Sequence, residues 1–155
     1  MLVLLFHIGR DRYALDTRHV IEILPLASLK TIPHAPTWVA GLLDYRGTTV
    51  PIVDLCQLAN QRPAARAFSS RNLIVSYQRT GDADVHKLGL TVERVLRTQR
   101  MEPGDFDEAG VDIENAHYLG RVATTEDGIV QLVEPHDLLT DDVHRLLFPK
   151  AAQPA

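Results

Sequence analysis

The chain has 155 residues and a mass of 17.3 kDa, which fits one compact unit or two small barrels fused around a shared core. Hydrophobic residues make up 45% of it and charged residues 23%, the balance of an ordinary globular protein rather than a disordered or membrane-spanning chain. The net charge of -4 argues against a protein whose main task is to bind phosphate backbones, since that task needs a clustered basic face.

Short strands dominate the chain, because runs of aliphatic, β-branched and aromatic residues alternate with turn signals. In chain order the predicted strands cover residues 2–8, 12–16, 20–25, 42–46, 48–54, 72–78, 87–99, 118–125 and 128–133. The apolar run Leu2 to Phe6 lacks a basic leader and is too short for a signal-peptide core or a membrane span, so it predicts a buried strand. The segment Thr17 to Ile23 could also begin as one helical turn.

Prolines and glycines organise the connections of the first half. The two prolines of Pro33 to Thr37 exclude regular helix and central strand, because proline fixes φ and lacks a donor. The next residues, Trp38 to Ala40, predict a short turn of helix that ends at Gly41. Gly47 predicts the turn of a hairpin, and residues 60–70, rich in Ala, Arg, Pro and Ser, predict an exposed linker.

The second half has the same character. A polar turn is predicted at Thr80 to Asp84, an acidic loop from Glu102 to Glu114, and a hairpin turn at Glu126 to Gly128. Pro135 predicts the first residue of a helix that runs to about Leu147 with one apolar face. Residues 151–155 are expected to form a frayed tail.

Several segments of the first half are repeated in the second. Tyr13 to Asp16 followed by Val20 to Ile23 aligns with Leu88 to Thr91 followed by Val95 to Thr98, an offset of 75 residues from Tyr13 to Leu88. Gly41 leading to Ile52-Val53-Asp54-Leu55 likewise resembles Gly120 leading to Ile129-Val130-Gln131-Leu132. The repeat predicts a single domain over residues 1–150, made of two pseudo-repeats (about 2–60 and 71–147) joined by the linker near 60–70.

Two copies of a unit of short strands favour a pair of small barrels, which also removes exposed sheet edges. The predicted fold is therefore mainly β, with a few short helices and one C-terminal helix. The apolar positions of both halves are expected to fill the barrel interiors and a third layer between the barrels. The positions expected to be buried are Leu15, Val20, Ile52, Val53, Leu90, Val95, Ile129 and Leu132.

No reaction chemistry is evident in the residues. The seven histidines show no metal-binding spacing, so no metal ligands are predicted; within the last helix, His136 and His144 stand about two turns apart. Cys56 has no second cysteine to pair with, which indicates the cytoplasm, and after an apolar strand it is expected to pack as a small hydrophobe. The dispersed glycines form no phosphate-binding loop, so neither a catalytic site nor a cofactor is predicted.

Two blocks of the sequence are more specific than this pattern. The first is His7-Ile8-Gly9-x-x-x-Tyr13-Ala14-Leu15-Asp16-x-x-x-Val20-x-Glu22-Ile23; the second is Arg46-Gly47-x-x-Val50-Pro51-Ile52-Val53-Asp54-Leu55. Together with Leu88-Gly89-Leu90-Thr91-Val92-Glu93 and Tyr118-Leu119-Gly120, they resemble the motifs of CheW-like domains over about residues 3–147.

The resemblance implies two SH3-like five-stranded β-barrels in one intertwined unit, with no enzymatic activity. It implies a cytoplasmic adaptor, peripheral to membrane-bound receptor arrays, that couples the signalling tip of a chemoreceptor to the regulatory domain of a CheA-type histidine kinase. By position in the motifs, Glu22 and Arg46 resemble the receptor-proximal polar pair of the family, with Asp44 and Tyr45 beside them. Asp44-Tyr45 stands where the family usually has Asn-Leu, and Glu93 where it commonly has Asp, so the identity of the partner receptor stays open.

Other functions remain as alternatives. Double small barrels also support nucleic-acid or ribosome binding, against which the acidic charge counts. An enzyme with a site assembled from scattered residues would need a pocket with convergent titratable groups. The chain could also be a CheW-like part of a larger kinase, although the motifs, which span most of it from residue 3, favour a stand-alone protein.

Overall fold

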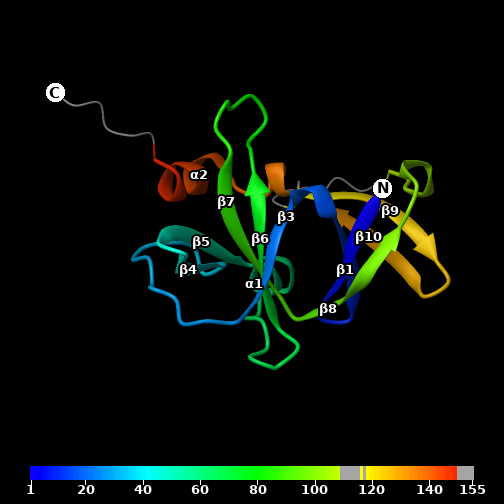
Figure 1. The fold of residues 1–155 in the computed structure, drawn as a ribbon, viewed down its shortest axis with the longest axis horizontal. Helices are drawn as coiled ribbons and strands as arrows, with labels where there is room; N and C mark the ends of the chain where they lie inside the picture. The colour runs from blue at the N-terminus through cyan, green and yellow to red at the C-terminus, as the bar shows by residue number, and fades with distance from the viewer. Residues whose placement is uncertain (109–115, 117, 150–155) are drawn as a thin grey trace.

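The computed structural model describes residues 1–108, 116 and 118–149, arranged as two five-stranded sheets that lie side by side (Figure 1). The strands are β1 Leu2–Ile8, β2 Asp11–Asp16, β3 Val20–Pro25, β4 Val39–Tyr45, β5 Thr48–Asp54, β6 Arg71–Tyr77, β7 His86–Val92, β8 Arg94–Arg100, β9 Leu119–Thr125 and β10 Gly128–Val133. Two α-helices, α1 Leu55–Asn60 and α2 Asp141–Leu147, and 3₁₀ turns at Thr17–His19, Pro103–Asp105 and Pro135–Asp137 complete the described elements.

The two sheets share one topology and exchange strands. The first has the order β8-β1-β2-β10-β9 and the second the order β3-β6-β7-β5-β4. Moving each strand five places along the chain converts one order into the other, and each sheet takes strands from both halves of the chain. The predicted mainly β fold in one intertwined unit is confirmed; the proposed boundaries of the two pseudo-repeats stay a prediction.

Each sheet curls until its two edge strands approach each other, and one isolated bridge links the edges. Lys30, which follows β3, pairs with Leu42 of β4, and Asp107, which follows β8, pairs with Val122 of β9. Gly41 makes the first bridge possible: it has a φ of +148°, and a Cβ atom there would lie 2.5 Å from the Lys30 carbonyl oxygen. The two edges of each sheet are therefore joined by a single bridge rather than by a continuous ladder.

The buried apolar residues form three clusters. One draws only on the first sheet and its flanking residues, and includes Val3, Leu5 and Val130; a second draws only on the second sheet, and includes Val50 and Ile52. The largest joins both sheets to the helices and includes Leu4, Phe6, Leu73, Leu90 and Val143. This confirms the predicted apolar layer between the barrels. Successive residues of β1 belong to different clusters, so both faces of this strand are buried, which explains its unbroken apolar run.

Most positions that we expected in the core are buried, but Ile129 is 65% exposed, and Val20 and Val95 are only partly buried. The error lies in the alignment of the repeats. The sequence repeat aligns Ile52 with Ile129, an offset of 77 residues. In the shared topology, however, the strand that begins at Thr48 corresponds to the strand that begins at Gly128, an offset of 80 residues. The difference of three residues is odd, and an odd shift moves a strand residue to the other face.

Three predicted elements also differ from the structure. Trp38 to Ala40 is not a helical turn, because β4 already begins at Val39 and pairs with β5. The predicted strand 87–99 is two strands separated at Glu93, where the chain passes from the second sheet to the first. The C-terminal helix is interrupted, because Thr140 has an extended backbone between the 3₁₀ turn and α2.

Two further segments differ in how far the sequence anticipates them. The acidic loop 102–114 contains a 3₁₀ turn and one bridge before residues 109–115, which lie outside the described part of the chain, as does the predicted tail 151–155. Helix α1 was not predicted at all. Its N-cap is Asp54, whose carboxylate accepts the N–H groups of Cys56 and Gln57.

Glu93 connects three parts of the chain at the crossing between the sheets. Its carboxylate accepts the N–H of Gly9 at 2.7 Å and that of Ala65 at 3.0 Å, and forms a two-point ion pair with Arg62 at 2.8 and 3.2 Å. The Glu93 side chain is only 13% exposed. The β1–β2 turn, the linker after α1 and the β7–β8 crossing are therefore held by one carboxylate.

Candidate functional site

The β4–β5 hairpin places Arg46 at the tip of a tight turn. Arg46 and Gly47 both have positive φ values, 52° and 83°, between the paired residues Tyr45 and Thr48, as expected of a two-residue type I′ turn. The Asp44 carboxylate accepts the N–H of Gly47 at 2.9 Å and so stabilises the turn. The Arg46 side chain is 73% exposed as a result.

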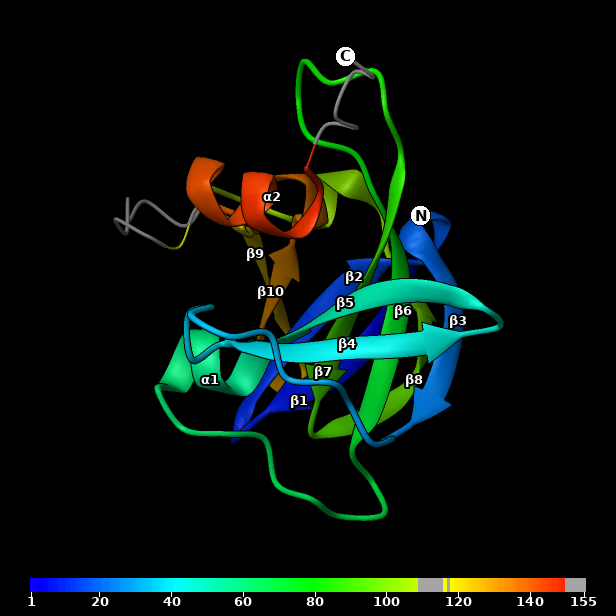
Figure 2. The ribbon, with the colours of Figure 1, turned by 90° about the vertical axis from the view of Figure 1, so that its left-hand side faces the viewer.

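Glu22 reaches this turn from the opposite edge of the same sheet. Strand β3 carries one extra residue between Val20 and Glu22 relative to β6, a β-bulge that changes the direction of the following side chains. Tyr45 Oη and Arg46 Nη2 both donate to Glu22 Oε1 at 2.7 Å. Figure 2 shows the tip of the β4–β5 hairpin beside β3. These three residues, which we call the seam triad, link the two edges of the second sheet through their side chains.

Tyr45, in the seam triad, makes a hydrogen bond through its hydroxyl and cation–π contacts through its ring. The hydrogen bond to Glu22 raises the pKa of the Tyr45 phenol, because its proton is shared with a carboxylate. The Arg46 guanidinium carbon lies 5.2 Å and the Lys87 Nζ atom 5.8 Å from the centroid of the Tyr45 ring, within the range of a cation–π contact. Arg46 uses Nη2 for Glu22, and the exposed guanidinium has further donors for a carboxylate or carbonyl of a partner.

Three of the four residues predicted for partner binding therefore lie together. Asp44 is exposed next to them, but its carboxylate bonds to the turn backbone and not to Glu22 or Arg46. Their role in binding stays a prediction.

The first sheet has a similar ionic contact between its two edges, with the acidic residue in the turn and the basic residue on the edge strand. The sequence patterns did not reveal this contact. Asp127, in the β9–β10 turn, lies 3.9 Å from Arg97 of β8 and 3.4 Å from Arg12 of β2. Strand β8 corresponds to β3, and the β9–β10 turn to the β4–β5 turn, in the topology that the sheets share. The edges of each sheet are thus linked by charged side chains, with the acidic and basic partners exchanged.

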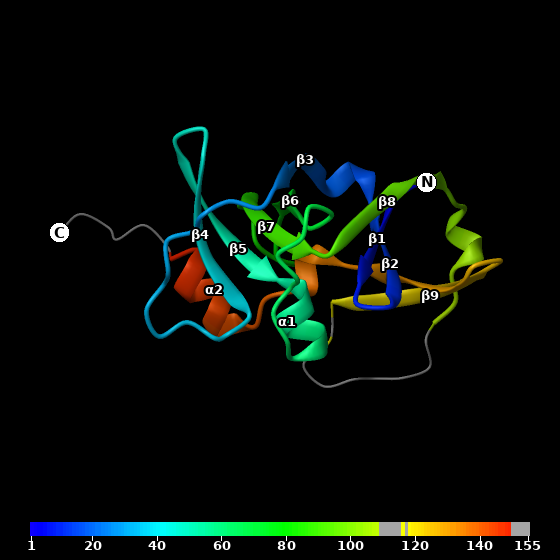
Figure 3. The same ribbon diagram turned by 90° about the horizontal axis from the view of Figure 1, so that it is seen from below.

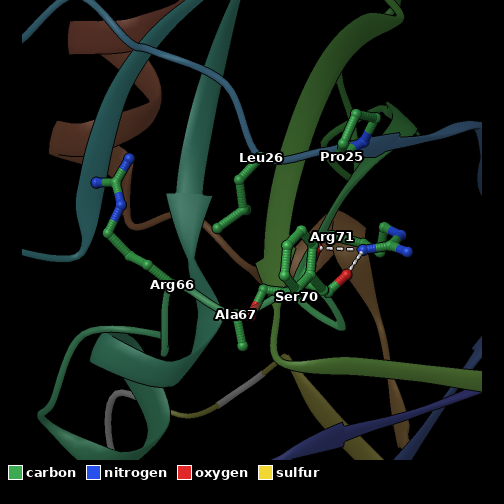
Figure 4. A pocket seen from close by; sticks show the side chains of 7 residues that line it. Pro25, Leu26, Arg66, Ala67, Ser70 and Arg71 are labelled. Atoms are coloured by element: carbon green, nitrogen blue, oxygen red, sulfur yellow. Dashed lines mark hydrogen bonds between the residues drawn. The ribbon is translucent and has the colours of Figure 1, made fainter.

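A hollow of about 450 Å³ lies between the end of β3 and the segment that leads into β6 (Figure 4). Its polar side chains are Arg66, Ser70 and Arg71, and Arg71 Nη1 is bonded to the carbonyl oxygen of Ser70 at 2.8 Å. The lining contains no carboxylate, imidazole or thiol. It thus lacks the convergent acid and base groups that an enzyme site in this hollow would need.

Cys56 lies in α1, which packs between the two sheets (Figure 3), and its side chain is fully buried as expected. Burial, together with the nearby Glu93 carboxylate, raises the pKa of the thiol to about 12. The thiolate is the reactive form, so roughly one molecule in ten thousand carries it at pH 8. We therefore expect iodoacetamide to leave the native chain unlabelled and to label it once in denaturant, as mass spectrometry would show. Rapid labelling of the native chain would contradict this burial.

Within the residues described, no helix is both long and apolar enough to cross a membrane.

Comparison with known proteins agrees with this architecture. The family model described as the CheW-like domain matches residues 2–143. The chemotaxis protein CheW of Treponema pallidum (strain Nichols) is 24% identical over 153 residues, which cover 96% of this chain and 82% of the relative. Protein FrzA of Myxococcus xanthus is 24% identical over 119 residues, or 76% of this chain and 71% of its own.

The same fold occurs among solved structures. The crystal structure of the scaffolding protein TtCheW from Thermoanaerobacter tengcongensis matches with a TM-score of 0.76 and 24% identity, over 88% of this chain and 90% of that one. Because the family model covers most of its length, the chain belongs to the family of CheW-like domain proteins.

Proposed function

We propose that this protein is a non-catalytic adaptor of a chemosensory array, which couples the cytoplasmic signalling tip of a chemoreceptor to a CheA-type histidine kinase. Its membership of the CheW-like family supports a role in chemotaxis, and the related TtCheW is described as a scaffolding protein. In this role the chain acts in the cytoplasm, at the membrane-bound receptor array.

The observation that carries the proposal is the seam triad of Glu22, Tyr45 and Arg46. A solvent-exposed guanidinium is held by one carboxylate at 2.7 Å, on a turn whose backbone is itself fixed by Asp44. This arrangement limits the conformational entropy that Arg46 loses on binding, because the side chain is already positioned. It suits a carboxylate or a backbone carbonyl on a partner helix, which a planar arginine fork recognises well.

An adaptor transmits a signal through simultaneous contacts and not through chemistry. The hollow beside β6 has no acid–base pair that could activate its Ser70 hydroxyl, and the cysteine is buried. Two similar sheets that exchange strands within one unit provide separate surfaces for two partners, which is the geometry that coupling requires.

The test is reconstitution with purified receptor signalling fragment and the histidine kinase from the same source. We expect the adaptor to sediment with receptor and kinase together, and kinase autophosphorylation to increase only when all three are present. Binding to neither protein would contradict the proposal. Kinase activation without the receptor would contradict the coupling role specifically.

A further inference from the structure

A second cluster of functional groups belongs to the same sheet as the seam triad and lies between the β6–β7 hairpin and α2 (Figure 2). Asp82 lies in the hairpin turn, His86 begins β7, and His144 lies in α2. Each offers one nitrogen or oxygen atom, and these three atoms lie within 4.8 Å of one another. The two histidines are far apart in the chain, at positions 86 and 144, which is why the spacing of the histidines predicted no metal site.

His144 is oriented as a metal-binding histidine usually is. Its Nε2 atom lies 3.6 Å from Asp82 Oδ2, and its Nδ1 atom is 2.9 Å from the hydroxyl of Tyr77. In the tautomer that carries its proton on Nδ1, this atom donates to the tyrosine oxygen and Nε2 keeps a lone pair for a ligand on the side of Asp82. An outer hydrogen bond of this kind fixes the tautomer and the ring orientation of a ligand histidine.

The other two side chains are also held in place. Asp82 Oδ1 accepts the N–H of Asp84 at 3.1 Å, and its main-chain oxygen accepts a bond from Gln78 at 2.9 Å, so Oδ2 is the carboxylate atom that faces the histidine. The His86 ring stacks on Phe148, with ring centroids 4.3 Å apart and planes inclined by 18°. The site is therefore supported from the hairpin and from α2.

A hollow leaves room for an ion beside the three side chains, and the two nearby arginines already form ion pairs with other residues. A hollow of about 490 Å³ is lined by Asp82, Asp84, His86, His144, Arg145 and Phe148, among others. Two arginines lie close, but Arg79 forms an ion pair with Asp141, and Arg145 forms one with Asp142. Asp84 adds a second carboxylate to the rim.

We propose that Asp82, His86 and His144 bind one divalent transition-metal ion of the zinc type, with water as the fourth ligand. Two imidazoles and one carboxylate are a ligand set that Zn²⁺ accepts. Ligand atoms at about 2.0–2.1 Å from a tetrahedral ion lie roughly 3.4 Å apart, so the side chains, whose ligand atoms now lie within 4.8 Å of one another, need to close by at most about 1.4 Å. The ion would fasten α2 to the β6–β7 hairpin. This inference goes beyond the proposed function and does not depend on it.

The experiment is calorimetric titration of Zn²⁺ into the full chain after treatment with a chelator, together with thermal unfolding with and without Zn²⁺. We expect one ion per chain and a higher unfolding temperature, because the ion binds the folded state. The variants Asp82→Asn and His86→Phe should each weaken binding by at least about 10-fold, since even outer-shell changes cost 10–100-fold. Asn keeps the acceptor for Asp84, and Phe keeps the stack on Phe148, so both should fold.

The matched control is His34→Asn, which removes an exposed histidine outside the cluster at a position with φ of 64°, where Asn is well tolerated. It should bind Zn²⁺ like the wild type. A second readout is Tyr77→Phe, which keeps all three ligands but removes the outer hydrogen bond and should weaken binding by roughly 10-fold. If the wild type binds no stoichiometric Zn²⁺, or if Asp82→Asn and His86→Phe bind it as well as His34→Asn does, the proposal is wrong.

Discussion

The Arg46→Glu variant should unfold at nearly the same temperature as the wild type and yet lose most of its affinity for the receptor. Arg46 is 73% exposed, and an exposed ion pair such as Arg46–Glu22 contributes about 0–1 kcal/mol to stability. Its turn conformation, with φ of 52°, costs a glutamate no more than an arginine. Binding is different, because the reversed charge would face a partner group that accepts a guanidinium.

We expect the loss of affinity to be at least about 2 kcal/mol, or roughly 30-fold, as for other charge pairs broken at an interface. The measurement is thermal unfolding beside a receptor-binding assay on the same preparation. The matched control is Arg97→Glu, which makes the same charge change in the corresponding pair of the first sheet. This control should keep receptor binding.

A charge-exchange variant separates two explanations of such a result. The double variant Glu22→Arg with Arg46→Glu restores an ion pair within the seam triad but reverses the charge at the tip of the turn. If a partner reads the guanidinium at the tip, the double variant should stay as weak as Arg46→Glu. Recovery of binding would mean that Arg46 serves only to hold the hairpin, and unfolding of Arg46→Glu would mean that it is structural.

The Glu93→Gln variant should lose about 2 kcal/mol of the free energy of unfolding, which corresponds to a fall of about 4–8 °C in the unfolding temperature. The carboxylate receives Arg62 and two backbone N–H groups while 13% exposed. A glutamine has one acceptor oxygen, and its NH₂ group would face donors. The change therefore weakens the bonds from Gly9 in the β1–β2 turn and from Arg62 and Ala65 in the linker after α1, so that both segments lose their attachment to the crossing.

This contribution should depend on pH in a defined direction. The bond with Arg62 and those from Ala65 and Gly9 lower the pKa of Glu93 from 4.5 to about 2. A carboxylate whose pKa is lowered by folding stabilises the protein above its unfolded pKa, and this stabilisation disappears as the pH falls from about 4.5 to about 2. The difference between wild type and Glu93→Gln should shrink over that window.

Denaturant unfolding at several pH values measures this difference. Glu126→Gln is the control, because it removes the same charge from an exposed residue of the β9–β10 turn. It should change stability little at any pH. A Glu93→Gln protein as stable as this control at neutral pH would show that the crossing does not depend on the carboxylate.

The sequence by itself determined the local features of this protein. Alternation of apolar residues and turn signals located the strands, and Gly47 located the turn that carries Arg46. The motifs also placed Glu22, Tyr45 and Arg46 on the list of partner-binding residues, and the structure brings these three together at 2.7 Å. These features depend on side-chain period and backbone conformation, which short segments encode.

Only the tertiary structure decided what depends on pairing between distant segments. Ile129 was misplaced because similarity of short aliphatic runs does not specify register to within one residue, whereas the ladder between β9 and β10 does. The strand predicted over residues 87–99 is divided at Glu93 because the chain passes there from one sheet to the other. At that crossing, Gly9 and Arg62 donate to the Glu93 carboxylate. Asp82, His86 and His144 meet because α2 packs beside the β6–β7 hairpin, a contact between distant segments that no local spacing records.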